Sequence, residues 1–187
     1  MRLLVQHEVE HRLCVIFVML VLAMPTLARG AEDAHPVDGT DRSEWAGVWQ
    51  LDRDSSDPIE PLLKQMEVAW VTRKIGNAMS PTLTISVLPN GGLRVLNQNP
   101  IQTTDRQIPA HGTPYERTDT LGRRVVSKEW WNDAGQLVVV DENHFDDDRI
   151  VVVTSTWTCA GDHIDLMNHV ETEDGPLLIR RIFRRKP

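Results

Sequence analysis

The sequence predicts an all-β protein, a ten-stranded up-and-down antiparallel barrel with a helix-turn-helix lid inserted after the first strand. From residue 81 to the C-terminus, short runs of alternating polar and apolar residues are separated by turn signals, with no helical period. Between residues 58 and 78, apolar side chains recur at helical spacing, and Gly76, Asn77 and Pro81 then end the helix. Regular short strands joined by tight turns favour a barrel over an α/β sheet.

The N-terminal segment has the pattern of a secretory signal. The 12-residue run from Leu13 to Met24 is apolar, and a small-residue segment with cleavage expected after Ala28 or Gly30 follows it. A membrane-spanning helix needs roughly 20 such residues, so we expect a cleaved signal and a secreted or periplasmic protein rather than an anchored one. The 187-residue chain then divides into a signal peptide (1–30), a flexible polar lead-in (31–43) and one β-barrel domain (44–187).

The expected first strand and lid follow the lead-in. Trp45–Leu51 alternates as a strand, with Trp49 as a packing residue at the closed end of the barrel. The next segment, with Ser56 or Asp57 as N-cap, starts a short helix over Pro58–Gln65. A second helix over 68–78 completes the lid.

Nine further strands follow the lid. Pro89-Asn90-Gly91-Gly92 is the strongest hairpin turn among the connections between them. The expected strands are 82–88, 92–97, 101–108, 113–120, 123–131, 136–142, 149–158, 163–171 and 177–184.

One run of residues identifies a family. Thr72-Arg73-Lys74, Gly76-Asn77 and Pro81 to Ser86 together resemble the segment of the fatty-acid-binding protein family in which the helical lid passes into the second strand. Weaker matches over 115–127 and 181–183 extend the resemblance to essentially residues 44–187. The resemblance implies the lidded barrel, with a ligand held inside it.

The resemblance also implies ligand-binding residues. Arg181 and Phe183 occupy the positions of an Arg-x-Tyr pair that holds a carboxylate, so the tyrosine hydroxyl is missing here. A second internal arginine of the family falls at Trp157. Trp70 lies at the position of a residue in the portal or the ceiling of the cavity. Ile101 occupies the position of an aromatic residue beside the opening, and ordinary strand packing is the alternative role for Ile101. Tyr115, in the middle strands, completes the expected set.

The sequence does not decide whether the Arg181 side chain points into the barrel or out of it. Ile179, Arg181 and Phe183 could face inward. The alternative places Leu178, Arg180, Ile182 and Arg184 inward, and alternation alone does not choose between the two. An inward Arg181 could hold a carboxylate bidentately in a low-dielectric interior. In the alternative the basic C-terminal run is a solvated edge.

Other functions have less support. A formal net charge of −7 disfavours binding to nucleic acid. His163, Asp165 and His169 share one strand face, but Ile164, Leu166 and Val170 of that strand need the core face, so we expect no metal site there.

We therefore expect a non-enzymatic, monomeric carrier of a fatty acid or another small hydrophobic ligand, with no cofactor, no metal and no stable membrane insertion. No motif of a known catalytic class is present. Two alternatives remain: a lipocalin-like isomerase or cyclase using Tyr115, Glu116 or His111, and a secreted interaction module whose barrel is packed by its own side chains.

Overall fold

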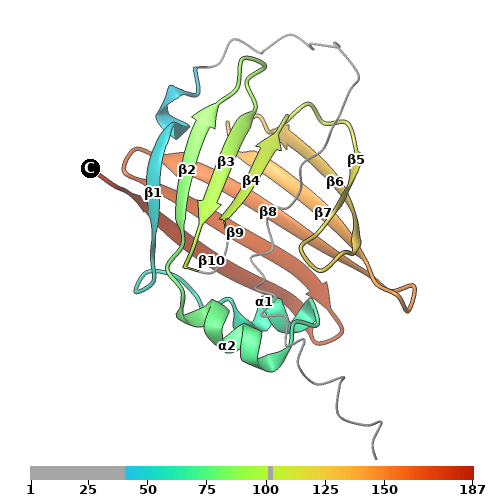
Figure 1. The fold of residues 1–187 in the computed structure, drawn as a ribbon. Coiled ribbons are helices and arrows are strands. Elements are labelled where there is room, and N and C mark those ends of the chain that lie inside the picture. The colour runs from blue at the N-terminus through green and yellow to red at the C-terminus, as the bar shows by residue number, and fades with distance from the viewer. Residues whose placement is uncertain (1–40, 101–102) are drawn as a thin grey trace, which may run out of the picture.

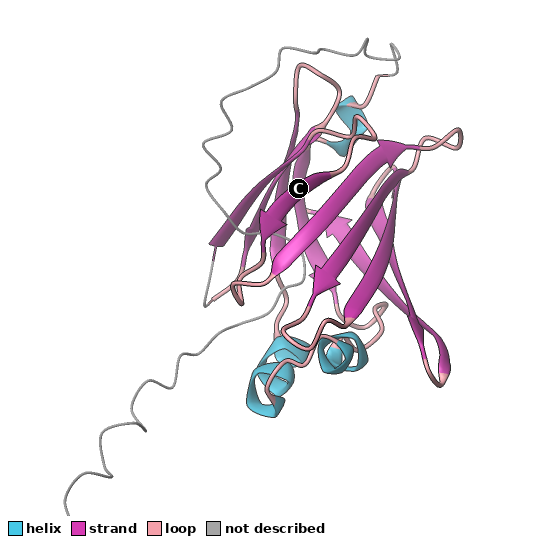
Figure 2. Cartoon of the chain, turned by 90° about the vertical axis from the view of Figure 1, so that its right-hand side faces the viewer, coloured by secondary structure: helices cyan, strands magenta, loops and turns pink. Residues whose placement is uncertain are grey.

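The computed structural model describes residues 41–100 and 103–187. Their ten strands form one antiparallel sheet in the order β4-β3-β2-β1-β10-β9-β8-β7-β6-β5. The sheet curls into a barrel-like shape, and two short helices lie across one end of it (Figures 1 and 2). The predicted fold class is confirmed. The predicted signal peptide, nearly all of the lead-in, and Ile101 lie outside the described residues.

The elements follow the expected order closely. A 3-10 turn, η1 (Ser43–Trp45), precedes the first strand, and the lid helices are α1 (Glu60–Gln65) and α2 (Trp70–Ala78). The strands are β1 (Gly47–Asp52), β2 (Thr82–Val87), β3 (Leu93–Gln98), β4 (Thr103–Ile108), β5 (Tyr115–Thr118), β6 (Arg124–Trp131), β7 (Leu137–His144), β8 (Ile150–Ala160), β9 (His163–Thr172) and β10 (Gly175–Arg185).

The start of α1 differs from the prediction. The helix begins at Glu60 after Ile59, and neither Ser56 nor Asp57 caps it. The backbone N–H of Ile59 instead donates to Oδ1 of Asn77, at the end of α2, over 3.1 Å. The cap comes from the second helix of the lid, so local sequence could not identify it. After α1, Glu67 has a φ of 54°, the left-handed conformation that commonly ends a helix.

The last strand lies in the middle of the sheet. β10 pairs with β1 on one side and with β9 on the other. The two edges of the sheet are β4 and β5, which share no backbone ladder among the described residues. Because the sheet curls, these edges come together on the wall opposite β10; we call this place the seam.

Candidate functional site

The inward faces of the strands carry two separate apolar clusters. The closed-end cluster lies at the end away from the lid and includes Trp49, whose Nε1–H donates to the carbonyl of Trp45 over 3.1 Å. Its members are Trp45, Trp49, Leu51, Leu83, Ile85, Leu93, Val95, Ile108, Leu137, Val139, Trp157, Ile164, Leu166 and Phe183. The lid cluster joins the helices to the far ends of the strands through Leu62, Leu63, Met66, Val68, Val151, Val153, Val170 and Ile179.

Buried polar side chains separate the two clusters. On β10, Arg181 lies between Ile179 of the lid cluster and Phe183 of the closed-end cluster. On β8 and β9 the polar residues between the clusters are Ser155 and Asn168, and the Ser155 hydroxyl donates to Oδ1 of Asn168 over 2.9 Å. The interior is therefore apolar at both ends and polar between them.

Arg181 faces inward, which decides between the two registers of the last strand. It is 5% exposed, whereas Leu178 is 58% exposed. Its neighbour Arg180 points outward and makes a bidentate ion pair with Asp165, with Nη2 2.5 Å from the carboxylate. The register with Ile179, Arg181 and Phe183 inside is the correct one.

Arg181 has no hydrogen-bonding partner for its buried Nε. Burial, with a smaller contribution from the charge of Arg53, lowers the pKa of the Arg181 guanidinium to about 10, and Asp57 opposes this only in part. The group is still cationic at neutral pH. It is thus a buried charge between two apolar clusters, with no ion pair among the described residues, and such an arrangement is costly.

At the seam, side chains join the two edge strands. Nη2 of Arg106, on β4, lies 3.3 Å from the hydroxyl of Tyr115, on β5, and also pairs with Oε1 of Glu129, on β6. The Tyr115 hydroxyl donates to the same Oε1 over 2.6 Å. Burial raises the pKa of Tyr115 to about 12, so this hydroxyl keeps its proton at neutral pH.

A second set of contacts continues the network onto β7. Arg117 donates to the Ser127 hydroxyl over 2.8 Å and to Asp141 over 2.9 Å, and Ser127 donates to Asp141 over 2.6 Å. Burial alone would raise the pKa of Asp141, but the charges of Arg106 and Arg117 outweigh it and lower that pKa. The seam network, defined as Arg106, Tyr115, Arg117, Ser127, Glu129 and Asp141, holds two cations and two anions.

The other predicted site residues occupy different surroundings. Phe183 and Trp157 are buried in the closed-end cluster, at 3% and 2% exposure. Trp157 and Arg181 are both in register with Leu166, so they lie in one row across three strands. The buried Trp157 Nε1–H has no acceptor. Trp70 is 61% exposed on α2, away from these groups.

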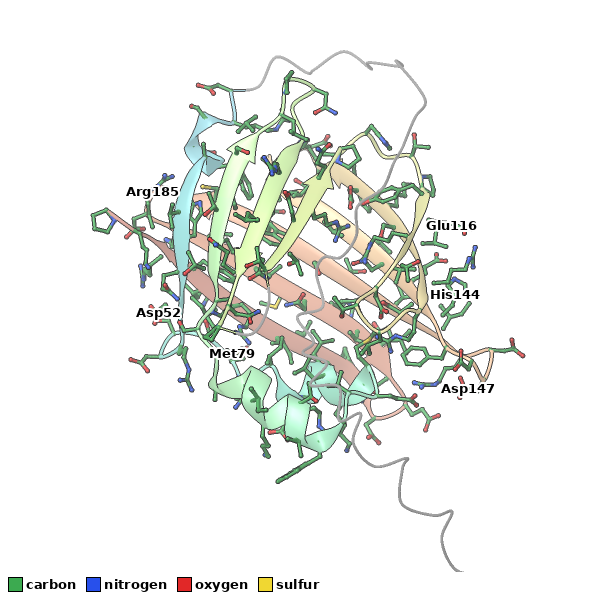
Figure 3. The ribbon with its side chains drawn as sticks, in the orientation of Figure 1. Asp52, Met79, Glu116, His144, Asp147 and Arg185 are labelled. Carbon is green, nitrogen blue, oxygen red and sulfur yellow. The ribbon has the colours of Figure 1, made fainter. Side chains whose placement is uncertain are left out.

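The acid–base groups of the enzyme alternative do not converge. Glu116 points outward and pairs with Arg124, close to His144, as their labelled positions show (Figure 3). His111 is exposed, and its ring accepts the backbone N–H of Thr113 over 3.0 Å. Of the three groups, Tyr115 alone faces the interior.

Sequence analysis identified Tyr115 of the seam network but missed its charged partners Arg106 and Glu129. Arg106 lies in the run Thr-Thr-Asp-Arg-Gln-Ile, in which Ile108 is the one apolar residue, so alternation gives only a weak signal for the inward side. Glu129 precedes two tryptophans and also resembles a solvent-facing residue. The ion pair between Arg106 and Glu129 joins residues 23 positions apart, so it is evident only in the folded structure.

The described part of the chain shows neither a metal site nor a membrane-spanning helix. Residues 41–100 and 103–187 contain no group of three or more metal-ligating side chains that could hold an ion. Nor does any helix there have the length and apolar character to span a membrane.

Comparisons with known proteins agree with this architecture. A fatty acid-binding protein of Clonorchis sinensis is 26% identical over 111 residues, which are 59% of this chain and 80% of that protein. The structure of a Schistosoma mansoni fatty acid binding protein in complex with arachidonic acid matches with a TM-score of 0.63 and 20% identity, over 78% of this chain and 98% of that one.

As-p18, described as an extracellular fatty acid binding protein, matches with a TM-score of 0.56 and 15% identity, over 77% of this chain and 97% of its own. No protein-family model matches the chain. The solved structures establish the fold, and the Clonorchis protein extends the likeness to sequence.

Proposed function

Because the chain resembles the fatty-acid-binding proteins in both sequence and fold, we propose that it binds a fatty acid or a similar amphipathic ligand inside the barrel, without covalent chemistry. The observation that carries this proposal is Arg181, a buried cation with an unpartnered Nε between two apolar clusters. A carboxylate would supply the missing charge and acceptors, and the clusters would contact the hydrocarbon chain.

The interior fits an anionic head group better than a neutral one. Moving a guanidinium out of water costs several kcal/mol unless it is paired, and a carboxylate can accept two of its N–H groups at once. Trp157, in the same row, offers one more unused N–H donor. Phe183 has no hydroxyl group with which to bind a head group. Arg181 is therefore the polar side chain of β10 that faces the interior and can bind an anion.

The direct test compares a fluorescent fatty acid with its neutral alcohol in titrations of wild type and Arg181→Gln. Loss of a charged hydrogen bond of about 1.5–3 kcal/mol should weaken the acid by roughly 10- to 150-fold and leave the alcohol nearly unchanged. Arg180→Gln, at the outward-facing neighbour, is the matched control and should bind both probes like wild type. Equal affinity of wild type and Arg181→Gln for the acid would remove Arg181 from the site.

A second measurement separates a carrier from a packed module. Lipid extracted from the purified mature protein should contain a carboxylic acid detectable by mass spectrometry, at close to one molecule per chain. Conversion of that molecule into product during incubation would support an enzyme instead.

The proposal also covers where the protein is located. We infer that residues 1–30 direct export and that the mature protein is secreted or periplasmic and monomeric. N-terminal sequencing of the protein recovered from the exported fraction should begin after Ala28 or Gly30. Recovery of the chain with Met1 intact from the cytosol would contradict export.

A further inference from the structure

A second set of unused polar atoms lies on the wall opposite Arg181. In the seam network, Nε and Nη1 of Arg106 and Oε2 of Glu129 are buried without a hydrogen-bonding partner. The two residues are 6% and 1% exposed, so bulk water does not reach these atoms. Buried polar groups in native proteins are almost always satisfied, and each exception needs an explanation.

The kind of group that would complete this set follows from the chemistry of the atoms. Arg106 offers N–H donors, while the free Glu129 oxygen is an acceptor. A hydroxyl group accepts one hydrogen bond and donates another, so it matches both. A ketone could accept from Arg106 but would leave the Glu129 oxygen unsatisfied. A second carboxylate would be repelled by the negative charge of Glu129.

Charge balance points the same way. Arg106 and Arg117 are matched within the seam network by Glu129 and Asp141. The network therefore has no surplus charge to attract an ion, in contrast to Arg181. A neutral group is the appropriate occupant at the seam, and an anion at β10.

The sheet order sets the two places apart. β10 is in the middle of the sheet, whereas Arg106 belongs to the edge strand β4 and its partners to β5 and β6 at the other edge (Figure 1). A ligand held at Arg181 by its head group would have to extend across the interior to reach the seam, which a long chain can do.

We propose that the ligand is a hydroxylated fatty acid, whose carboxylate binds Arg181 and whose chain hydroxyl accepts from Arg106 and donates to Glu129. This inference rests on the proposed binding function and specifies its substrate class. The competing occupant of the seam is a buried water molecule, which would satisfy the same atoms and leave the ligand chain unsubstituted.

The test is a competition series against a bound fluorescent fatty acid. The probes are stearic acid and sets of hydroxystearic and oxostearic acids in which the substituent moves along the chain. At one position or two adjacent positions, the hydroxy acid should bind wild type about tenfold more tightly than stearic acid, equivalent to about 1.4 kcal/mol, and more tightly than the oxo acid. If stearic acid binds and no hydroxy isomer exceeds it, the inference is overturned and the carrier function stands. If neither stearic acid nor any substituted acid binds, both the carrier function and the inference are refuted.

Two variants connect the preference to the seam. Glu129→Gln replaces the free acceptor by an amide group that can present a donor, so the favoured hydroxy acid should lose its advantage over the matching oxo acid. Arg181→Gln should weaken every acid and keep the ratio of hydroxy to unsubstituted acid. An unchanged hydroxy preference in a folded Glu129→Gln, checked by circular dichroism, would refute the role of Glu129. If that variant does not fold, the wild-type series decides alone.

Discussion

Replacing Arg181 by methionine should stabilise the empty protein while weakening its ligand binding. The lowering of the Arg181 pKa from the ordinary arginine value to about 10 corresponds to about 3 kcal/mol at 1.36 kcal/mol per pH unit. This free energy is the cost of keeping the guanidinium charged inside the empty barrel at neutral pH. Methionine fills a similar volume without a charge, so its gain should be about 1–3 kcal/mol.

The assay for this prediction is thermal unfolding of delipidated protein followed by circular dichroism. A gain of 1–3 kcal/mol should raise Tm by about 3–9 °C for a domain of this size. Arg180→Met is the matched control: it removes an exposed ion pair with Asp165, so its Tm should change little or fall slightly. A marked fall in Tm for Arg181→Met would refute the reasoning, because it would mean that Arg181 is paired in the empty protein.

Two more predictions concern the framework around the site. Gly92→Ala should lower the unfolding free energy measured in urea by about 3 kcal/mol, because an added Cβ would lie 2.3 Å from the carbonyl oxygen of Ile108. The control Gly135→Ala, where φ is 74° and the space is open, should cost only about 1–2 kcal/mol, and equal costs for the two variants would contradict the clash. Asp141 has a lowered pKa in the folded state, so its contribution is complete above the unfolded value near 3.8 and is lost as pH falls toward the folded value. The unfolding free energy of Asp141→Asn should therefore depend less on pH below about pH 4 than that of wild type, and parallel curves would exclude this origin of acid lability.

The strands were predictable because the sequence encodes them locally. Polar and apolar residues alternate between tight turns, and β2 was predicted as 82–88 and observed as Thr82–Val87. Even the lid followed from helical spacing, although its first residue did not, because Asn77 caps α1 from the end of α2. Local pattern is sufficient wherever one face of an element is clearly apolar.

The interior polar residues could not be assigned in this way. β10 carries apolar and basic residues on both faces, so only its pairing with β1 and β9 shows that Arg181 is inside. Arg106 and Glu129 resemble surface residues in sequence, and their burial depends on contacts between strands far apart in the chain. Arg181 and Tyr115 were anticipated through the family resemblance, whereas the resemblance did not point to Arg106 or Glu129.

The central position of β10 constrains how the protein can assemble. Among the described strands, β1 to β4 form one continuous ladder and β5 to β9 another, and β10 alone hydrogen-bonds to both. The two halves can therefore unite only after β10 has been synthesised. Until then the facing edges of β1 and β9 stay open, and a truncation at Gly175 that removes β10 would leave two incomplete sheets rather than a slightly smaller barrel.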